Sequence, residues 1–98
     1  MTNRLLLAAL AALAAPIAAA QDGAALVQTH NCGMCHAHGI GGTFQAISDK
    51  YAGKADATAT VAAVIKDGTK SGSARMPPTA VSEADARAMA AYILSLRK

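Results

Sequence analysis

The sequence contains no tryptophan, one phenylalanine and two tyrosines, so it has few of the large side chains that usually fill a core. Its 98 residues have room for one domain, and a domain of this size gains only about 3–5 kcal/mol from a single core. Charge is also sparse, with a formal net charge of +3 and no basic run with interleaved aromatic residues, which argues against nucleic-acid binding. We therefore expect a small domain whose core is completed by an apolar cofactor.

Only two cysteines are present, and both lie in the stretch Asn31-Cys32-Gly33-Met34-Cys35-His36. A thioredoxin-like redox pair has this spacing, but it needs a strand–helix–strand context, and no strand pattern appears here. A structural zinc site needs four ligands, usually from two pairs, whereas this chain has no second cysteine pair. A structural disulfide with this spacing would close a very small loop and would gain little stability.

The histidine directly after the pair favours a fourth interpretation, a c-type haem attachment site. Each thiolate adds to one vinyl group of the porphyrin, and the short spacing holds both bonds at one edge of the ring. The next side chain then lies under the ring with a nitrogen aimed at the iron. The sequence thus predicts a covalent haem c on Cys32 and Cys35, with His36 as an axial ligand.

The N-terminal 20 residues have the pattern of a secretory leader. Arg4 is followed by an apolar run from Leu5 to Ala20 that ends in three alanines, which supply the small residues that a signal peptidase needs. The run has 16 residues and contains Pro16, which is short of the ~20 needed to span a bilayer. We expect cleavage after Ala20 and export of residues 21–98 to the periplasm, where haem is attached to such sites. An uncleaved anchor is the alternative.

The exported part shows a helical pattern interrupted by turns at Gly and Pro. Four helices are predicted, at residues 22–31, 44–52, 57–67 and from 82 onward. Asp22, Thr43, Asp56 and Ser82 are suitable N-caps, and Gly53 and Gly68 are suitable stops. The first and last helices should cross, because both ends of a small domain must bury their apolar faces.

Three groups of apolar residues repeat at helical spacing and should face inward. The first group packs against the cofactor or the core, and the last forms the stripe of the terminal helix. The groups are Phe44, Ile47 and Tyr51; Val61, Val64 and Ile65; and Met89, Tyr92, Ile93 and Leu96.

A thioether is a suitable second axial ligand for an electron-transfer haem, and the chain has four methionines. Met1 leaves with the leader, and Met34 lies between the cysteines, from where it cannot reach the far face of the ring. Met89 falls on a helix stripe, where core packing is the simpler role. His38 is too close to His36 to reach the opposite face of the same iron, and His30 fits a helix end.

Met76 differs from the other methionines because it lies in a loop, 40 residues after His36. Pro77 and Pro78 follow it and hold this loop in an extended conformation. The alternative is a loop residue that plugs the core. Beside a haem attachment site, however, Met76 is the predicted second ligand of the iron.

Taken in order, these segments resemble the small bacterial class I cytochromes c of the c551/c8 kind. The segments that carry the resemblance are Cys32-Gly33-Met34-Cys35-His36, Phe44-x-x-Ile47-x-x-Lys50-Tyr51-Ala52-Gly53, Ile65-Lys66-Asp67-Gly68, Met76-Pro77-Pro78, Val81-Ser82 and Ala91-Tyr92-Ile93-Leu94-Ser95. The resemblance implies an all-α fold of about four helices around one haem, with His36 and Met76 as axial ligands. It also implies one-electron transfer between redox protein partners in the periplasm. With both axial positions filled there is no site for a small-molecule substrate, so we do not expect an enzyme.

The chain departs from that family at two places. Gly41-Gly42 stands where the family usually has Gly-Pro, whose carbonyl accepts a hydrogen bond from the axial histidine. Gly42 can still offer a carbonyl, on a looser backbone. The tryptophan that often precedes the methionine loop is absent, which leaves Ser71, Ser73 and Arg75 as candidate partners of the haem propionates.

Two other functions stay open from the sequence. The chain can be a tightly bound haem subunit of a periplasmic oxidoreductase, or a gas-binding or peroxidase-like protein in which Met76 is displaced. Lys50, Lys54, Lys70 and Arg75 either surround the exposed haem edge and steer an acidic partner, or only keep the surface solvated.

Overall fold

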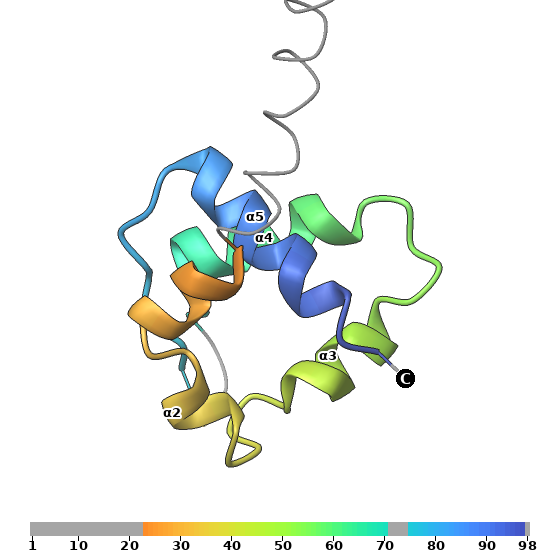
Figure 1. The fold of residues 1–98 in the computed structure, drawn as a ribbon, viewed down its shortest axis with the longest axis horizontal. Coiled ribbons are helices and arrows are strands. Elements are labelled where there is room, and N and C mark those ends of the chain that lie inside the picture. The colour runs from red at the N-terminus through yellow and green to blue at the C-terminus, as the bar shows by residue number, and fades with distance from the viewer. Residues whose placement is uncertain (1–22, 71–74, 98) are drawn as a thin grey trace, which may run out of the picture.

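The computed structural model describes residues 23–70 and 75–97, and every regular element within these ranges is a helix (Figure 1). A helical segment at residues 23–29 is followed by four helices, α2 (Gly33–His36), α3 (Phe44–Lys50), α4 (Ala57–Asp67) and α5 (Glu83–Leu94). The predicted all-α class is confirmed. The predicted leader lies outside the described residues, and none of the helices that are described is long and apolar enough to cross a membrane.

Local capping signals set most helix ends. Thr43 Oγ1 accepts a hydrogen bond from the backbone N–H of Ala46 at 3.1 Å and begins α3, which ends two residues earlier than predicted. Ser82 Oγ begins α5 in the same way by accepting from Asp85 N at 3.1 Å. These bonds satisfy backbone donors that have no partner within the helix.

Helix α4 has its predicted bounds, but its predicted cap is only partly correct. Asp56 precedes the helix and makes no side-chain capping bond, because its backbone (φ −100°, ψ 14°) is not in the extended conformation that capping requires. At the other end, Gly68 has φ 71°, and the helix ends there as predicted.

The core lies mainly between α4 and α5, and α3 packs on α5. Its fully buried side chains include Met89, which is 0% exposed, as its place on the predicted stripe implies. Ser48 of α3 is also buried, and its Oγ donates a hydrogen bond to the carbonyl of Leu94 at 2.7 Å. This bond ties α3 to the last residue of α5. The remaining core residues are Val27, Val61, Ala62, Ile65, Ala86, Ala90 and Ile93.

The N-terminal helical segment crosses α5 at Gly23 (Figure 1). A Cβ placed on Gly23 would collide with the carbonyl of Ala88 and lie 3.1 Å from Cβ of Tyr92. The two backbones therefore approach closely here because one residue has no side chain. The expected crossing of the terminal helices is confirmed.

The Cys-x-x-Cys-His stretch forms a helix of its own, which the sequence did not predict. The segment at 23–29 ends before the predicted Asn31, because Asn31 adopts φ 55° and turns the chain. Asparagine tolerates this left-handed conformation better than most residues. Helix α2 then follows from Cys32, its N-cap.

Candidate functional site

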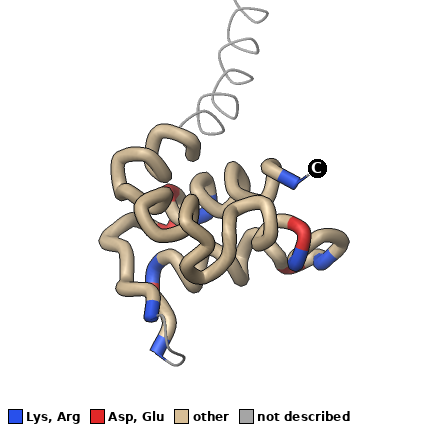
Figure 2. Tube along the Cα trace, turned by 90° about the horizontal axis from the view of Figure 1, so that it is seen from below, with Lys and Arg blue, Asp and Glu red and all other residues tan. Residues whose placement is uncertain are grey.

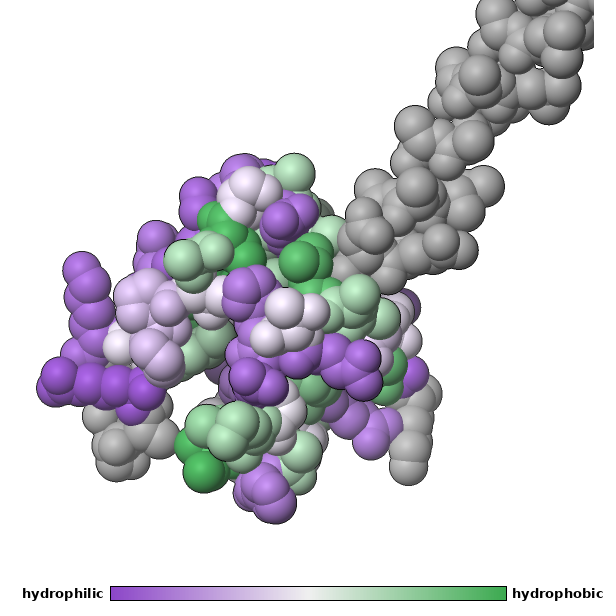
Figure 3. All heavy atoms as spheres, turned by 60° about the vertical axis from the view of Figure 1, so that its left-hand side comes forward, coloured by the Kyte–Doolittle hydropathy of each residue, from purple (hydrophilic) through white to green (hydrophobic). Residues whose placement is uncertain are grey.

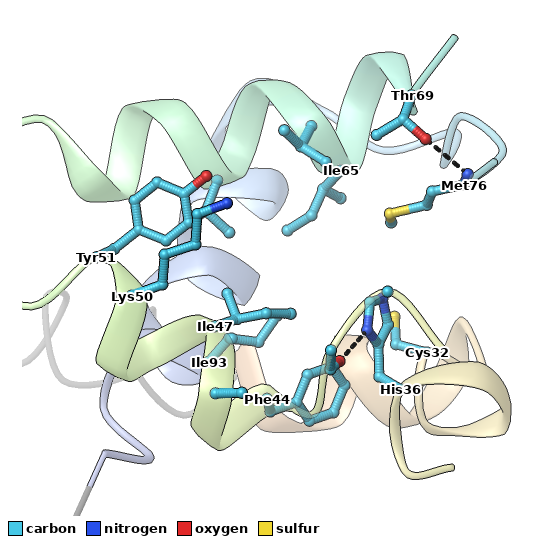
Figure 4. Close-up of a pocket in the computed structure, with 15 residues that line it drawn as sticks. Cys32, His36, Phe44, Ile47, Lys50, Tyr51, Ile65, Thr69, Met76 and Ile93 are labelled. Atoms are coloured by element: carbon cyan, nitrogen blue, oxygen red, sulfur yellow. Dashed lines mark hydrogen bonds between the residues drawn. The ribbon is translucent and has the colours of Figure 1, made fainter. Parts of the chain in front are cut away.

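Helices α3 and α4 and the loop after α4 enclose an apolar cavity of about 340 Å³ (Figure 4). Phe44, Ile47 and Tyr51, predicted to share one helix face, all line it. The predicted inward-facing residues of α4 form another wall, namely Val61, Val64 and Ile65. The apolar pattern of the sequence thus faces this cavity as well as the core.

His36 extends from the end of α2 into one side of this cavity (Figure 4). Its Nδ1 lies 2.7 Å from the carbonyl oxygen of Gly42. A carbonyl oxygen can only accept, so Nδ1 carries the proton and Nε2 is the nitrogen with a lone pair for a ligand bond. Phe44 packs beside the imidazole, with ring centroids 5.3 Å apart and an interplanar angle of 31°.

Met76 points into the cavity from the side opposite His36 (Figure 4). Its backbone is held on both sides by Thr69. The N–H of Met76 donates to Thr69 Oγ1 at 2.8 Å, and the N–H of Thr69 donates to the carbonyl of Met76 at 2.9 Å. This pair of bonds fixes the position from which the thioether enters the cavity.

The loop of Met76 also docks on the end of α4. Thr79 N donates to the carbonyl of Ile65 at 2.9 Å. A Cβ on Gly68 would collide with the carbonyl oxygen of Met76 and lie 2.9 Å from the carbonyl carbon of Pro77. The sequence pattern predicts Gly68 only as the end of a helix. It gives no signal for Thr69, because a single threonine in a loop has no distinctive feature.

No disulfide joins Cys32 and Cys35. Cys32 is half-buried and lines the cavity, and burial raises the pKa of its thiol, while a backbone hydrogen bond opposes this shift. Cys35 is exposed and lines a smaller cavity of about 160 Å³. The two cavities share Cys32, His36, Gly41 and Met76, so they are adjoining parts of one slot.

The other sequence candidates lie elsewhere. Met34 is 71% exposed, Met89 is buried in the core, and His38 is exposed, so among the described methionines only Met76 lines the slot. His30 and Arg75 line the smaller cavity. Ser71 and Ser73 lie outside the described residues. The zinc interpretation gains no support from the part of the chain described, where no group of three His, Cys, Asp or Glu side chains is placed to hold a metal ion.

The donor set fits a haem. An imidazole and a thioether face each other across an apolar slot (Figure 4), and the two thiols of a Cys-x-x-Cys-His stretch line it beside the imidazole. Nitrogen and thioether sulfur are the axial donors of cytochromes c. The apolar walls match the porphyrin. A zinc ion or a disulfide would not need such walls. The site thus has the chemistry of a c-type haem protein.

Comparisons with known proteins agree with this class. The family model described as "Cytochrome C oxidase, cbb3-type, subunit III" matches residues 18–93. Cytochrome c-551 of Azotobacter vinelandii is 39% identical over 80 residues, which cover 76% of this chain and 98% of that protein. Cytochrome c-552 of Nitrosomonas europaea is 40% identical over 84 residues, covering 80% of this chain and 82% of that protein. The crystal structure of wild-type Nitrosomonas europaea cytochrome c552 matches with a TM-score of 0.66 over 74% of this chain and 98% of that one.

The chain therefore belongs to the cytochrome c family, among the small monohaem cytochromes of the c-551 and c-552 kind. Members of this family carry covalently bound haem c and act as electron carriers. The resemblance drawn from the ordered segments of the sequence is confirmed.

Proposed function

We propose that this chain is a periplasmic one-electron carrier, with haem c bonded to Cys32 and Cys35 and with His36 and Met76 as axial ligands. One observation carries the ligand assignment: His36 and Met76 face each other across one apolar cavity, which Cys32 also lines (Figure 4). The haem supplies the iron that takes up and releases the electron.

The residues around the slot set the reduction potential of the haem. The Gly42 carbonyl fixes the tautomer of His36 and raises its basicity, because the imidazole donates Nδ1–H to it at 2.7 Å. A thioether ligand favours the reduced iron and raises the potential. The apolar walls keep water from the ring. With both axial positions filled by protein, the chain has no open iron position for a substrate, and its partners are redox proteins.

Export completes the proposal. Cleavage after Ala20 would release residues 21–98 as the cytochrome domain, in the compartment where haem is attached. The N-terminal sequence of the purified protein tests this directly, since a chain beginning at Met1 would contradict cleavage and a chain beginning at Gln21 would support it.

A tightly bound subunit of an oxidoreductase is less well supported. The chain covers 98% of cytochrome c-551 of Azotobacter vinelandii, a relative of similar size that is named as a cytochrome by itself. Lys and Arg lie at several separate places along the described chain (Figure 2). On the face seen in Figure 3, hydrophobic groups lie in several small areas between hydrophilic ones. The exposed large hydrophobic side chains of the described residues are Met34 and Ile40, at 71% and 51%.

The test is an optical spectrum of the exported protein, recorded before and after denaturing extraction. Haem that stays with the polypeptide, and a weak far-red iron–sulfur band in the oxidised form, are expected. Met76→Leu should remove that band and allow the reduced protein to bind carbon monoxide. Met34→Leu is the matched control, because Met34 is exposed and lies outside both cavities. Retention of the far-red band in Met76→Leu would reject the ligand assignment.

A further inference from the structure

The cavity has two chemically different ends (Figure 4). Cys32, His36 and Met76 lie at one end, and Lys50 and Tyr51 lie at the other, where α3 ends. Between the two ends the labelled side chains are aliphatic, namely Ile47, Ile65 and Ile93. A flat apolar ring placed between His36 and Met76 would therefore extend from the thiols toward a lysine and a phenol.

Two lysines lie over the Tyr51 ring, and only one of them lines the cavity. Lys50 Nζ is 5.5 Å from the ring centroid, and Lys54 Nζ is 5.3 Å from it. Only Lys50 is part of the cavity wall. The two side chains therefore have the same charge and the same aromatic neighbour but differ in their access to the cavity.

Neither lysine has a carboxylate partner within residues 23–70 and 75–97, where both salt bridges involve Glu83. No Asp or Glu lines either of the two cavities. An ammonium group at the end of an apolar cavity that holds no protein carboxylate is suited to an anionic group brought in by a ligand.

A haem bonded through its vinyl groups carries its two propionates on the opposite edge of the porphyrin. Carboxylates that enter an apolar cavity are costly unless a cation or a hydrogen-bond donor meets them. Arg75, a candidate from the sequence, lines the smaller cavity together with both cysteines, which is the wrong end for this role. Lys50 and Tyr51 are the polar groups at the far end.

We infer that Lys50 pairs with a haem propionate and that the Tyr51 hydroxyl donates a hydrogen bond to the same group. This inference rests on the proposed attachment of haem to Cys32 and Cys35. It assigns a propionate partner in a chain that lacks the tryptophan often found before the methionine loop in this family. Lys50 and Tyr51 are positioning residues here, whereas Lys54 lies over the Tyr51 ring without lining the cavity.

The pairing predicts two linked changes in Lys50→Gln. A nearby cation stabilises the ionised propionate, so its loss should raise the pKa of that propionate by about one unit. A cation near the ring also disfavours the additional positive charge of oxidised iron, so its loss should lower the reduction potential. Tyr51→Phe should raise the same pKa by a smaller amount, because it removes a hydrogen bond and no charge.

The experiment uses the exported, haem-loaded protein. Haem carboxyls enriched in ¹³C are titrated by NMR, and the midpoint potential is measured against pH for the wild type, Lys50→Gln, Lys50→Arg and Lys54→Gln. We expect the propionate pKa to rise and the potential to fall in Lys50→Gln, with Lys50→Arg close to the wild type and Lys54→Gln unchanged. Lys50 is exposed, so its replacement should leave the fold intact.

Equal shifts in Lys50→Gln and Lys54→Gln would overturn the inference, since they would reflect general surface charge. An unchanged propionate pKa in Lys50→Gln would overturn it as well. In either case covalent haem and a low-spin spectrum would leave the proposed function standing. A wild-type protein without covalent haem would instead reject the proposed function, and this inference with it.

Discussion

The imidazole Nδ1 of His36 lies 2.7 Å from the carbonyl oxygen of Gly42, six residues further along the chain. Gly41 and Gly42 reach this arrangement with φ values of 73° and 91°. Proline is restricted to φ near −65° and cannot adopt the conformation found at Gly42. In the family, a proline carbonyl usually accepts this hydrogen bond from the axial histidine. In this chain the Gly42 carbonyl accepts it, on a left-handed backbone that suits glycine.

Gly41→Ala tests how closely this turn holds the imidazole. The new Cβ would lie 3.2 Å from Cε1 of His36, at a residue with φ 73°. Gly39→Ala is the control, because Gly39 has φ 83° and its Cβ would meet no atom within 4 Å. Both variants should lose about 1 kcal/mol of unfolding free energy to backbone strain, measured by denaturant titration. Only Gly41→Ala should also shift the NMR resonances of the His36 ring, and equal shifts in both would contradict the contact.

Gly68→Ala tests the docking of the Met76 loop on α4. A Cβ there would collide with the backbone of Met76 and lie 2.9 Å from Pro77, neither of which is a flexible side-chain end. Gly53→Ala is matched, since Gly53 also has a positive φ, 79°, but has open space around it. We expect Gly53→Ala to lower the free energy of unfolding by about 1 kcal/mol. Gly68→Ala should lower it clearly more and should also weaken the far-red iron–sulfur band. A far-red band of normal strength in Gly68→Ala would show that the loop tolerates displacement.

Thr69→Val removes the side-chain acceptor of the Met76 N–H while keeping the shape of the residue. An unpaired backbone donor costs about 1 kcal/mol when it is not rehydrated. We expect a several-fold increase in the rate at which an external ligand, such as imidazole, displaces Met76 from the oxidised iron. Thr79→Val should not change this rate, because Thr79 bonds to Ile65 through its backbone. Identical rates in the two variants would argue against the role of Thr69.

Ser48→Ala tests the tie between α3 and α5. The change leaves the carbonyl of Leu94 without the hydrogen bond that Ser48 Oγ donates at 2.7 Å. Ser48 is only 1% exposed. The expected loss is about 1 kcal/mol of unfolding free energy, measured by urea titration. Ser95→Ala removes a hydroxyl that bonds to Tyr92 on the surface of the same helix end and should cost less. A larger loss in Ser95→Ala would contradict the importance of the buried bond.

Acid should weaken the surface link at the start of α5. The hydrogen bond from Lys66, at 3.0 Å, and its charge hold the pKa of Glu83 below its usual 4.5, and Arg87 adds to this. The stabilisation is therefore present above the ordinary glutamate pKa and is lost as pH falls through the lowered folded value. Glu83→Gln should be slightly less stable than the wild type at pH 7, and the difference should vanish in acid and shrink in high salt. A difference that persists in acid would contradict this assignment.

Local chemistry made much of the chain predictable. Cys32, Cys35 and His36 are close in sequence, so their spacing alone indicates haem attachment. Helix α4 has its predicted bounds, and Thr43 and Ser82 cap their helices, because capping needs only a side chain and a backbone N–H within one turn. The assignment of the ligands themselves stays a prediction, which the facing side chains of His36 and Met76 support.

The tertiary structure decided contacts that reach beyond one turn of helix. The pairing of Thr69 with Met76 and the place of Lys50 opposite the thiols depend on how α2, α3 and the loop after α4 meet. Short-range propensity acts over one turn of helix and carries no information on such meetings. The sequence by itself thus determined which chemistry the chain carries, and the packing of its helices decided which residues surround that chemistry.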